Sequence, residues 1–315
     1  MQRVMQRVDW AMLLGLAVVF GSGFFLGDLG LQSFGPLTVA AGRVAGAAII
    51  LAVIALARGR RFPGDARTWW VLLVMGAINN AIPFSLIFWG QTHIDSALAA
   101  ILNAMTPIFT VLLAHLVGDE RLSGRRIAGV LFGFVGVAVL MGPDVLRRLD
   151  PTNAAELAVL LAALSYATAG LWGRRLRHLP TDVAAGGMLI ASSAILLPAA
   201  AWIERPWTAN PTATSLAAIA ILGLFCTATA YLLYFRLLAR VGATNLLLVT
   251  FLLPIVAMAL GTAFLGEHLA VGDFIGLALI LMGLATIDGR PLGWLRAKEP
   301  AAAGTSGSPR GSRPS

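Results

Sequence analysis

The sequence predicts an all-α integral membrane protein with ten transmembrane helices, arranged as two inverted-topology repeats of five helices each. Composition is the first observation behind this prediction. The chain has 315 residues, of which 58% are hydrophobic and only 12% are charged, and its mean hydropathy is +0.83. Because a soluble domain has about 25% charged residues, a soluble fold of this length has no room to hide so much apolar surface. The lipid bilayer is therefore the expected solvent.

The second observation is an internal repeat with an offset of 147 residues. The identical pairs are Pro107 and Pro254, Glu120 and Glu267, Leu122 and Leu269, Gly129 and Gly276, and Gly136 and Gly283. Five identities in one register, without a gap, indicate an internal duplication. We expect the first five-helix repeat in residues 1–143 and the second in residues 154–288.

The individual spans follow from the apolar runs. A helix needs about 20 mostly apolar residues to cross a bilayer, and short segments with Gly, Pro, Arg and Asp separate ten such runs. The expected spans are 10–30, 36–57, 68–90, 96–117, 126–142, 154–173, 182–202, 214–235, 243–265 and 269–287. The first run is too long for a signal core of roughly 7–15 residues, so we expect a retained helix. The polar residues 297–315 are expected to form a disordered cytoplasmic tail.

The distribution of basic residues predicts the orientation of these spans. With the N-terminus in the cytoplasm, 19 of the 23 lysines and arginines fall in cytoplasmic segments, three in external segments and Arg43 within a span. Basic loops stay inside, so both termini are expected in the cytoplasm. Because each repeat has an odd number of spans, the second enters the membrane upside down, as in many secondary transporters. The net charge of +8 is thus explained by basic residues in the cytoplasmic segments. We therefore expect no nucleic-acid partner.

Three motifs resemble the EamA-type branch of the drug/metabolite transporter superfamily. Residues 20–24, Phe-Gly-Ser-Gly-Phe, are similar to the family's W-G-S-x-F pattern, with Phe20 where Trp is usual. Pro36 followed by Arg43 is similar to the family's proline-to-arginine spacing. The signature P-x(12)-E-x(8)-G-x(6)-G occurs over 107–136 and again over 254–283. The resemblance covers about residues 10–288 and implies export of amino acids or other small metabolites, with nutrient or vitamin uptake as the alternative.

Polar side chains within the predicted spans mark the candidate substrate site, because such groups are costly in lipid and face a cavity or the bundle interior. The offset of 147 residues relates Asn80 to Thr227 and Asn103 to Thr250, so we expect groups from both halves to meet near the midplane. The expected substrate-binding residues are Asn79, Asn80, Asn103, Ser165, Tyr166, Thr227, Thr229, Tyr231 and Thr250. Hydrogen bonding between helices stays open as the alternative; we favour Asn80 and Asn103 for the cavity.

A second group of residues is expected at hinges and gates. Pro107 and Pro254 each remove a backbone donor and loosen the turn before them, which produces either a hinge or a static kink. Ser22, in the motif of the first helix, is grouped with them. Glu120 and Glu267 directly follow their spans, where they form a loop salt bridge or helix cap, or take part in gating.

Arg43 is the only basic residue within a predicted span, in its outer third. Two interpretations of it stay open. The side chain either snorkels outward or pairs with Asp28 at the end of the first helix, or it attracts a substrate carboxylate at the external mouth.

The sequence gives little support for an enzyme or a channel. The four histidines lie at or near helix ends, and the chain has no H-E-x-x-H, G-x-S-x-G or P-loop motif, so we expect no metal site, no cofactor and no enzyme. The single cysteine, Cys226, excludes an intrachain disulfide. A channel would require a filter segment or a ring of charge. We expect a monomer or homodimer in the bacterial inner membrane that contacts the lipid bilayer and moves a small-molecule substrate by alternating access.

Overall fold

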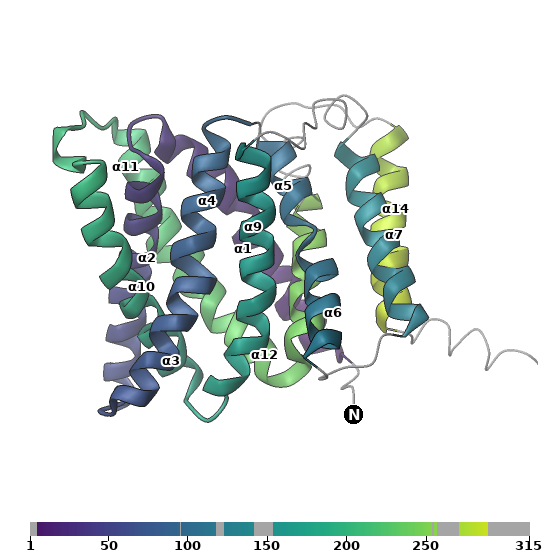
Figure 1. Cartoon of the computed structure of the whole chain (residues 1–315), viewed down its shortest axis with the longest axis horizontal. Coiled ribbons are helices and arrows are strands. Elements are labelled where there is room, and N and C mark those ends of the chain that lie inside the picture. The colour runs from purple at the N-terminus through teal and green to yellow at the C-terminus, as the bar shows by residue number, and fades with distance from the viewer. Residues whose placement is uncertain are drawn as a thin grey trace, which may run out of the picture.

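The apolar runs of the sequence fold into a bundle whose helices lie roughly along one direction (Figure 1). The computed structural model describes residues 5–94, 96–117, 123–141, 154–253, 255–256 and 271–288. Within these ranges all regular structure is helical. Three residues expected at hinges and gates, Pro254, Glu120 and Glu267, lie outside the described residues, as does the expected tail 297–315.

Six helical stretches in the described ranges are long and apolar enough to cross a bilayer. They are α1 (Arg7–Leu31), α2 (Pro36–Ala57), α3 (Ala66–Gly76) continued by η1 (Ala77–Ala81) and α4 (Ile82–Gln91), α9 (Ala154–Trp172) continued by η2 (Gly173–Leu176), α10 (Thr181–Ile203), and α11 (Ala213–Ala220) continued by η4 (Ile221–Thr227) and α12 (Ala228–Leu247). The sixth stretch ends at Gly242, where α12 is kinked by a non-helical backbone conformation. They coincide with six of the predicted spans. Large apolar side chains such as Leu14, Val18 and Ile49 are 52–65% exposed on them, as expected where lipid is the solvent.

The predicted span 96–117 is interrupted and forms two shorter helices, α5 (Ser96–Asn103) and α6 (Thr106–Leu116). Pro107 lies in the first turn of α6, where it cannot donate a hydrogen bond to the carbonyl four residues earlier, and where a continuous helix would bring its ring against that carbonyl. The carbonyl belongs to Asn103 and accepts the Thr106 hydroxyl instead, at 2.6 Å. Because the predicted span 243–265 is described only in part, the ten-span arrangement stays a prediction.

The remaining long helices, α7 (Gly124–Met141) and α14 (Val271–Asp288), lie side by side at one edge of the bundle (Figure 1). The offset of 147 residues converts one range into the other. A Cβ atom at Gly129 would lie 2.8 Å from the carbonyl oxygen of Gly283, and one at Gly136 would lie 2.8 Å from that of Gly276. The order of these contacts is reversed between the two helices. They therefore pack antiparallel, with their backbones in contact at the glycines.

Two π-helical turns interrupt the long stretches, and the sequence reasoning missed both. They are η1 and η4, and they contain Asn80 and Thr227, which the offset of 147 residues relates. A π-helical turn changes the hydrogen-bond register and releases backbone carbonyls for side-chain partners. Ser165 donates to the carbonyl of Ile78 at 2.7 Å, and Thr227 donates to that of Leu222 at 2.7 Å. Helix α9 thereby supplies a hydroxyl to η1, whereas in η4 the hydroxyl comes from the last residue of the turn itself.

The start of α2 is fixed by a side chain from another helix. Its N-cap residue is Gly35, which has no side chain to accept hydrogen bonds. Glu204, directly after α10, accepts the backbone N–H of Leu37 at 2.9 Å and that of Thr38 at 2.7 Å. A Cβ atom at position 35 would lie 2.3 Å from the Glu204 carboxyl carbon, so this approach requires glycine. The cap anchors the helix that carries Arg43.

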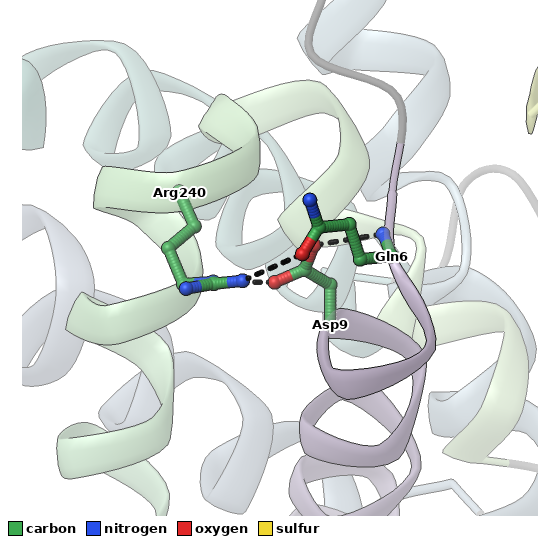
Figure 2. A network of polar contacts seen from close by, with 3 residues as sticks. All are labelled: Gln6, Asp9 and Arg240. Atoms are coloured by element: carbon green, nitrogen blue, oxygen red, sulfur yellow. Dashed lines mark hydrogen bonds and ion pairs between the residues drawn. The ribbon is translucent and has the colours of Figure 1, made fainter.

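A second interhelical link joins the N-terminal end of α1 to α12 (Figure 2). The Arg240 Nε donates to Asp9 Oδ1 at 2.5 Å, and the backbone N–H of Gln6 donates to Asp9 Oδ2 at 2.8 Å. The Asp9 side chain is 4% exposed, whereas that of Arg240 is 45% exposed. The link therefore consists of a buried carboxylate capped by its own helix and closed by a partly exposed cation.

Candidate functional site

A cavity of about 70 Å³ lies among α1, α2, η1, α4, α5, α9, α12 and residues 247–253. A single water needs roughly 10–15 Å³ of such volume, so the space holds several waters or a small molecule. Its polar wall residues are Arg43, Asn79, Gln91, Asn103, Tyr166, Tyr231, Tyr234 and Thr250. Its apolar wall residues are Phe20, Phe24, Phe84, Ile87, Phe88, Leu247, Val249 and Leu253, with Gly23. Both halves of the chain contribute to the wall.

Among the described residues that line the cavity, Arg43 is the only Lys or Arg, and it is 5% exposed. Its Nε donates to Thr227 Oγ1 at 2.9 Å, and its guanidinium carbon lies 4.1 Å from the centre of the Phe84 ring. The expected pair with Asp28 does not form, because Asp28 Oδ1 accepts Gln91 Nε2 at 2.9 Å instead. The arginine thus points into the bundle interior rather than outward along the helix.

Asn103, at the end of α5, is the polar wall residue with an unmet hydrogen-bonding need. It is 3% exposed, and its Oδ1 has no hydrogen-bond partner among the described residues. The break between α5 and α6 places it at the helix end. Its repeat-related counterpart, Thr250, also lines the cavity, but donates to the carbonyl of Leu247 at 2.9 Å. The two residues related by the offset therefore share one wall.

A third part of the wall is a network of tyrosines around Asn79. The Asn79 Nδ2 donates to the hydroxyl of Tyr231 at 3.2 Å, and the hydroxyl of Tyr234 donates to Asn79 Oδ1 at 3.4 Å. The two tyrosine rings meet edge to face with centres 5.7 Å apart, and Phe20 meets Tyr231 in the same manner at 6.2 Å. Tyr166, from α9, packs edge to face on Phe84. These contacts join the aromatic side chains of α1, α4, α9 and α12 into one wall.

Four of the expected substrate-binding residues lie off this wall. Asn80 is fully buried; its Nδ2 donates to Ser192 Oγ at 2.7 Å, and its Oδ1 accepts the Tyr231 hydroxyl. Ser165 and Thr227 bond the π-helical turns and, for Thr227, Arg43. Thr229 is half-buried on α12 and not among the wall residues. The first three have the interhelical role that the sequence left open as the alternative.

Of the expected hinge residues that the structure describes, Ser22 donates to the carbonyl of Val18 in its own helix at 2.8 Å, and Pro107 marks the break before α6. Neither lines the cavity.

Sequence reasoning missed most of the apolar wall. Phe20 and Phe24 on α1, and Phe84 and Phe88 on α4, are each spaced four residues apart and therefore lie on one helix face. That spacing was the available signal. Gln91 and Tyr234 complete the polar wall and were also left off the expected set. In the described ranges no three His, Cys, Asp or Glu side chains gather as metal ligands.

Comparisons with known proteins agree with this architecture. A crystal structure of a protein aligns with this chain at a TM-score of 0.70 with 20% sequence identity, covering 87% of this chain and 95% of that one. At this identity the likeness concerns the fold.

Two curated relatives match over most of their length. The uncharacterized inner membrane transporter YedA of Escherichia coli (strain K12) is 26% identical over 279 residues, which are 87% of this chain and 89% of YedA. The probable terminal-alkyne amino-acid exporter of Streptantibioticus cattleyicolor is 28% identical over 291 residues, which are 92% of this chain and 96% of the exporter.

A family model matches the chain twice, over residues 10–142 and 153–287. The model is that of the EamA-like transporter family, and the two matches together span most of the sequence. They also include every residue of the cavity wall. The chain is therefore a member of the EamA-like transporter family.

Proposed function

We propose that this protein is a secondary transporter that exports amino acids or related small metabolites across the bacterial inner membrane by alternating access. The observation that carries the proposal is the buried cavity, whose wall combines Arg43 and Asn103 from the first family match with Tyr231 and Thr250 from the second. A site between two halves is exposed to one side and then the other when the halves rock against each other. Binding at this cavity is thus coupled to movement across the membrane.

The proposal includes ten spans in two inverted repeats, residues 1–143 and 154–288, with both termini cytoplasmic. The antiparallel packing of α7 against α14 supports it, because two helices related by the repeat then run in opposite directions. The excess of basic residues in the segments assigned to the cytoplasm supports the orientation.

The wall residues Asn79, Asn103, Tyr166, Tyr231 and Thr250 are proposed to contact the substrate. The residues that lie off the wall, Asn80, Ser165, Thr227 and Thr229, are proposed to act indirectly, by holding the wall and the π-helical turns. The assignment of Pro107, Pro254, Ser22, Glu120 and Glu267 to hinges and gates remains part of the proposal.

Export of amino acids is favoured by the similarity to the Streptantibioticus cattleyicolor exporter, and location in the inner membrane by the similarity to the Escherichia coli transporter. Counterflow in proteoliposomes with the purified protein tests transport directly. We expect saturable exchange of a radiolabelled amino acid, which Asn103→Leu abolishes. If no amino acid in the full pool is exchanged while a vitamin or nucleoside is, the assignment of amino acids as substrates is wrong.

Direction needs a separate measurement in cells. Cells that produce the protein and are fed a dipeptide accumulate the released amino acid inside, so an exporter should lower its internal level and raise its external level. A matched strain with the Asn103→Leu variant controls for expression. Faster uptake from the medium with no added release would instead identify an uptake permease.

A further inference from the structure

The strongest unexplained feature of the cavity is the charge of Arg43. A buried charge in a membrane protein is costly and is normally paired. Arg43 is 5% exposed, and among the described residues no carboxylate lies within ion-pair distance of it. A guanidinium has five N–H donors, of which only the Nε–H forms a hydrogen bond within the described part of the chain.

The guanidinium is nevertheless held in a fixed orientation. Its Nε–H donates to Thr227, whose hydroxyl is itself committed to the carbonyl of Leu222. Its face lies on the Phe84 ring. A Cβ atom at Gly23, another wall residue, would lie 3.5 Å from both Nη1 and Nη2. One edge is therefore anchored, and the terminal nitrogens lie beside the wall, where they form the fork that matches a carboxylate.

Asn103 gives a second, independent indication of a ligand. Its Oδ1 is a buried hydrogen-bond acceptor without a partner among the described residues, and such a group is suited to an N–H donor. The wall holds no Asp or Glu side chain, and most of it is aromatic or aliphatic. The polar features that call for a ligand are thus one cation and one amide oxygen.

From these features we infer that Arg43 binds the carboxylate of the substrate, and that the cavity takes monocarboxylates with an apolar body, whose binding an N–H donor for Asn103 strengthens. Apolar α-amino acids carry both groups, the donor being their ammonium group. The inference rests on the proposed function in taking the cavity as the substrate site.

Charge balance at Arg43 favours a ligand with a single carboxylate over a dicarboxylate or a phosphate. One carboxylate neutralises the one wall cation, so that the occupied cavity carries no net charge from this pair while it crosses the low-dielectric interior. A second negative charge would have no partner among the described wall residues. It would then carry the desolvation cost that the first carboxylate removes.

Pairs of ligands that differ only in the carboxylate test this inference on the unaltered protein. Thermal unfolding of the purified full-length protein is measured with L-leucine, L-phenylalanine, 4-methylpentanoate and 3-phenylpropanoate, each against its amide. We expect the acids to raise the unfolding temperature and the amides to leave it unchanged. Equal stabilisation by acids and amides, or stabilisation by none of the acids, overturns the inference.

Variants at position 43 then connect the effect to the arginine. Arg43→Gln should weaken the apparent affinity for the acids by at least about tenfold, because a hydrogen bond to a charged group is lost. The affinity of Arg43→Lys for the acids should lie between those of the unaltered protein and Arg43→Gln, because lysine keeps the positive charge but lacks the two parallel N–H donors of the guanidinium. Arg58→Gln, at the exposed end of the same helix, is the matched control and should bind like the unaltered protein. Unchanged binding by Arg43→Gln overturns the inference.

The result also separates this inference from the proposed function. If 4-methylpentanoate binds through Arg43 while no amino acid shows counterflow, carboxylate recognition stands and amino-acid export fails. If leucinamide in tenfold excess inhibits leucine counterflow, and Arg43→Gln leaves counterflow at the unaltered rate, amino-acid transport stands and carboxylate recognition by Arg43 fails.

Discussion

Asn103 and Asn80 show at the residue scale how one type of side chain takes two roles in the same bundle. Both are buried amides in predicted spans. The amide of Asn80 is bonded to Ser192 and Tyr231, whereas Asn103 lines the cavity with its Oδ1 unpartnered among the described residues. A buried acceptor without a partner costs about 1–3 kcal/mol. Asn103 is therefore the amide whose chemistry is left for a ligand.

Substitution by leucine should separate the two roles. We expect Asn103→Leu to abolish transport with unfolding temperature unchanged or raised, because it removes an unsatisfied acceptor. Asn80→Leu should lower the free energy of unfolding by about 1–3 kcal/mol, because the Ser192 and Tyr231 hydroxyls lose a buried partner. Counterflow and thermal unfolding are measured on both variants. A destabilised Asn103→Leu, or an Asn80→Leu as stable as the unaltered protein, contradicts this division.

The sequence located buried polar groups well but did not indicate which way they face. A polar side chain in an apolar run is visible because burying it is costly, and Asn79, Asn103 and Thr250 do line the cavity. Which face of a helix meets the cavity is harder to infer, since lipid and protein interior are equally apolar and periodicity disappears. Phe84 and Phe88 thus read as ordinary apolar residues.

At the element scale, the sequence predicted a kink or hinge at Pro107, but it predicted neither the full division of the span 96–117 into α5 and α6 nor the π-helical turns. Pro107 has a local effect on the helix before it, whatever surrounds it. The turn η1 has distant partners instead. Ser192 on α10 donates to the carbonyl of Gly76, and Ser165 on α9 donates to that of Ile78. Such hydroxyls become adjacent only once the bundle has formed.

The link between α1 and α12 gives an element-scale prediction (Figure 2). Arg240→Gln should lower the free energy of unfolding by about 1 kcal/mol, because Arg240 is 45% exposed and solvent weakens the pair. The difference from the unaltered protein should shrink as salt is added. Arg236→Gln, an exposed arginine one turn earlier, is the matched control for thermal unfolding in detergent. A loss of the same size in both variants would argue against a specific link to Asp9.

At the scale of the whole molecule, the duplication explains why glycines recur at fixed places. The signature glycines of one half contact those of the other, Gly129 against Gly283 and Gly136 against Gly276. The repeated motif therefore encodes an interface between the halves as well as two separate helices.

This interface predicts a contrast between glycines of one helix. Gly136→Leu should prevent α7 and α14 from approaching, because a Cβ there would lie 2.6 Å from the backbone nitrogen of Ile280. Because the clash is with backbone atoms, the free energy of unfolding should fall by more than the roughly 1–3 kcal/mol that an overpacked core costs. Gly124→Leu, where a Cβ atom meets nothing within 4 Å, should be tolerated. The yield of monodisperse protein on size-exclusion chromatography measures both; similar yields would contradict the interface.

The last prediction concerns the number of transmembrane spans. The side of the membrane on which Ser123 lies distinguishes six spans from ten. If only the six long helices crossed the membrane, α5, α6 and α7 would all lie on the external side, and Ser123 with them. With ten spans, α5 and α6 together return the chain to the cytoplasm before α7 begins. Ser123 is exposed, so a cysteine there reports its side directly.

The labelling experiment uses a Cys226→Ala background and an impermeant maleimide on intact cells. We expect Ser123→Cys to be protected, like Arg61→Cys in the preceding cytoplasmic segment, whereas Thr208→Cys in the external segment after α10 should be labelled. All three positions are exposed, so differences in labelling reflect the side of the membrane. Labelling of Ser123→Cys in intact cells would contradict the prediction that residues 96–117 and 126–142 form the fourth and fifth spans. Without them the first half would have three spans, so the five-span repeat would be wrong, although an odd number of spans would still invert the second half.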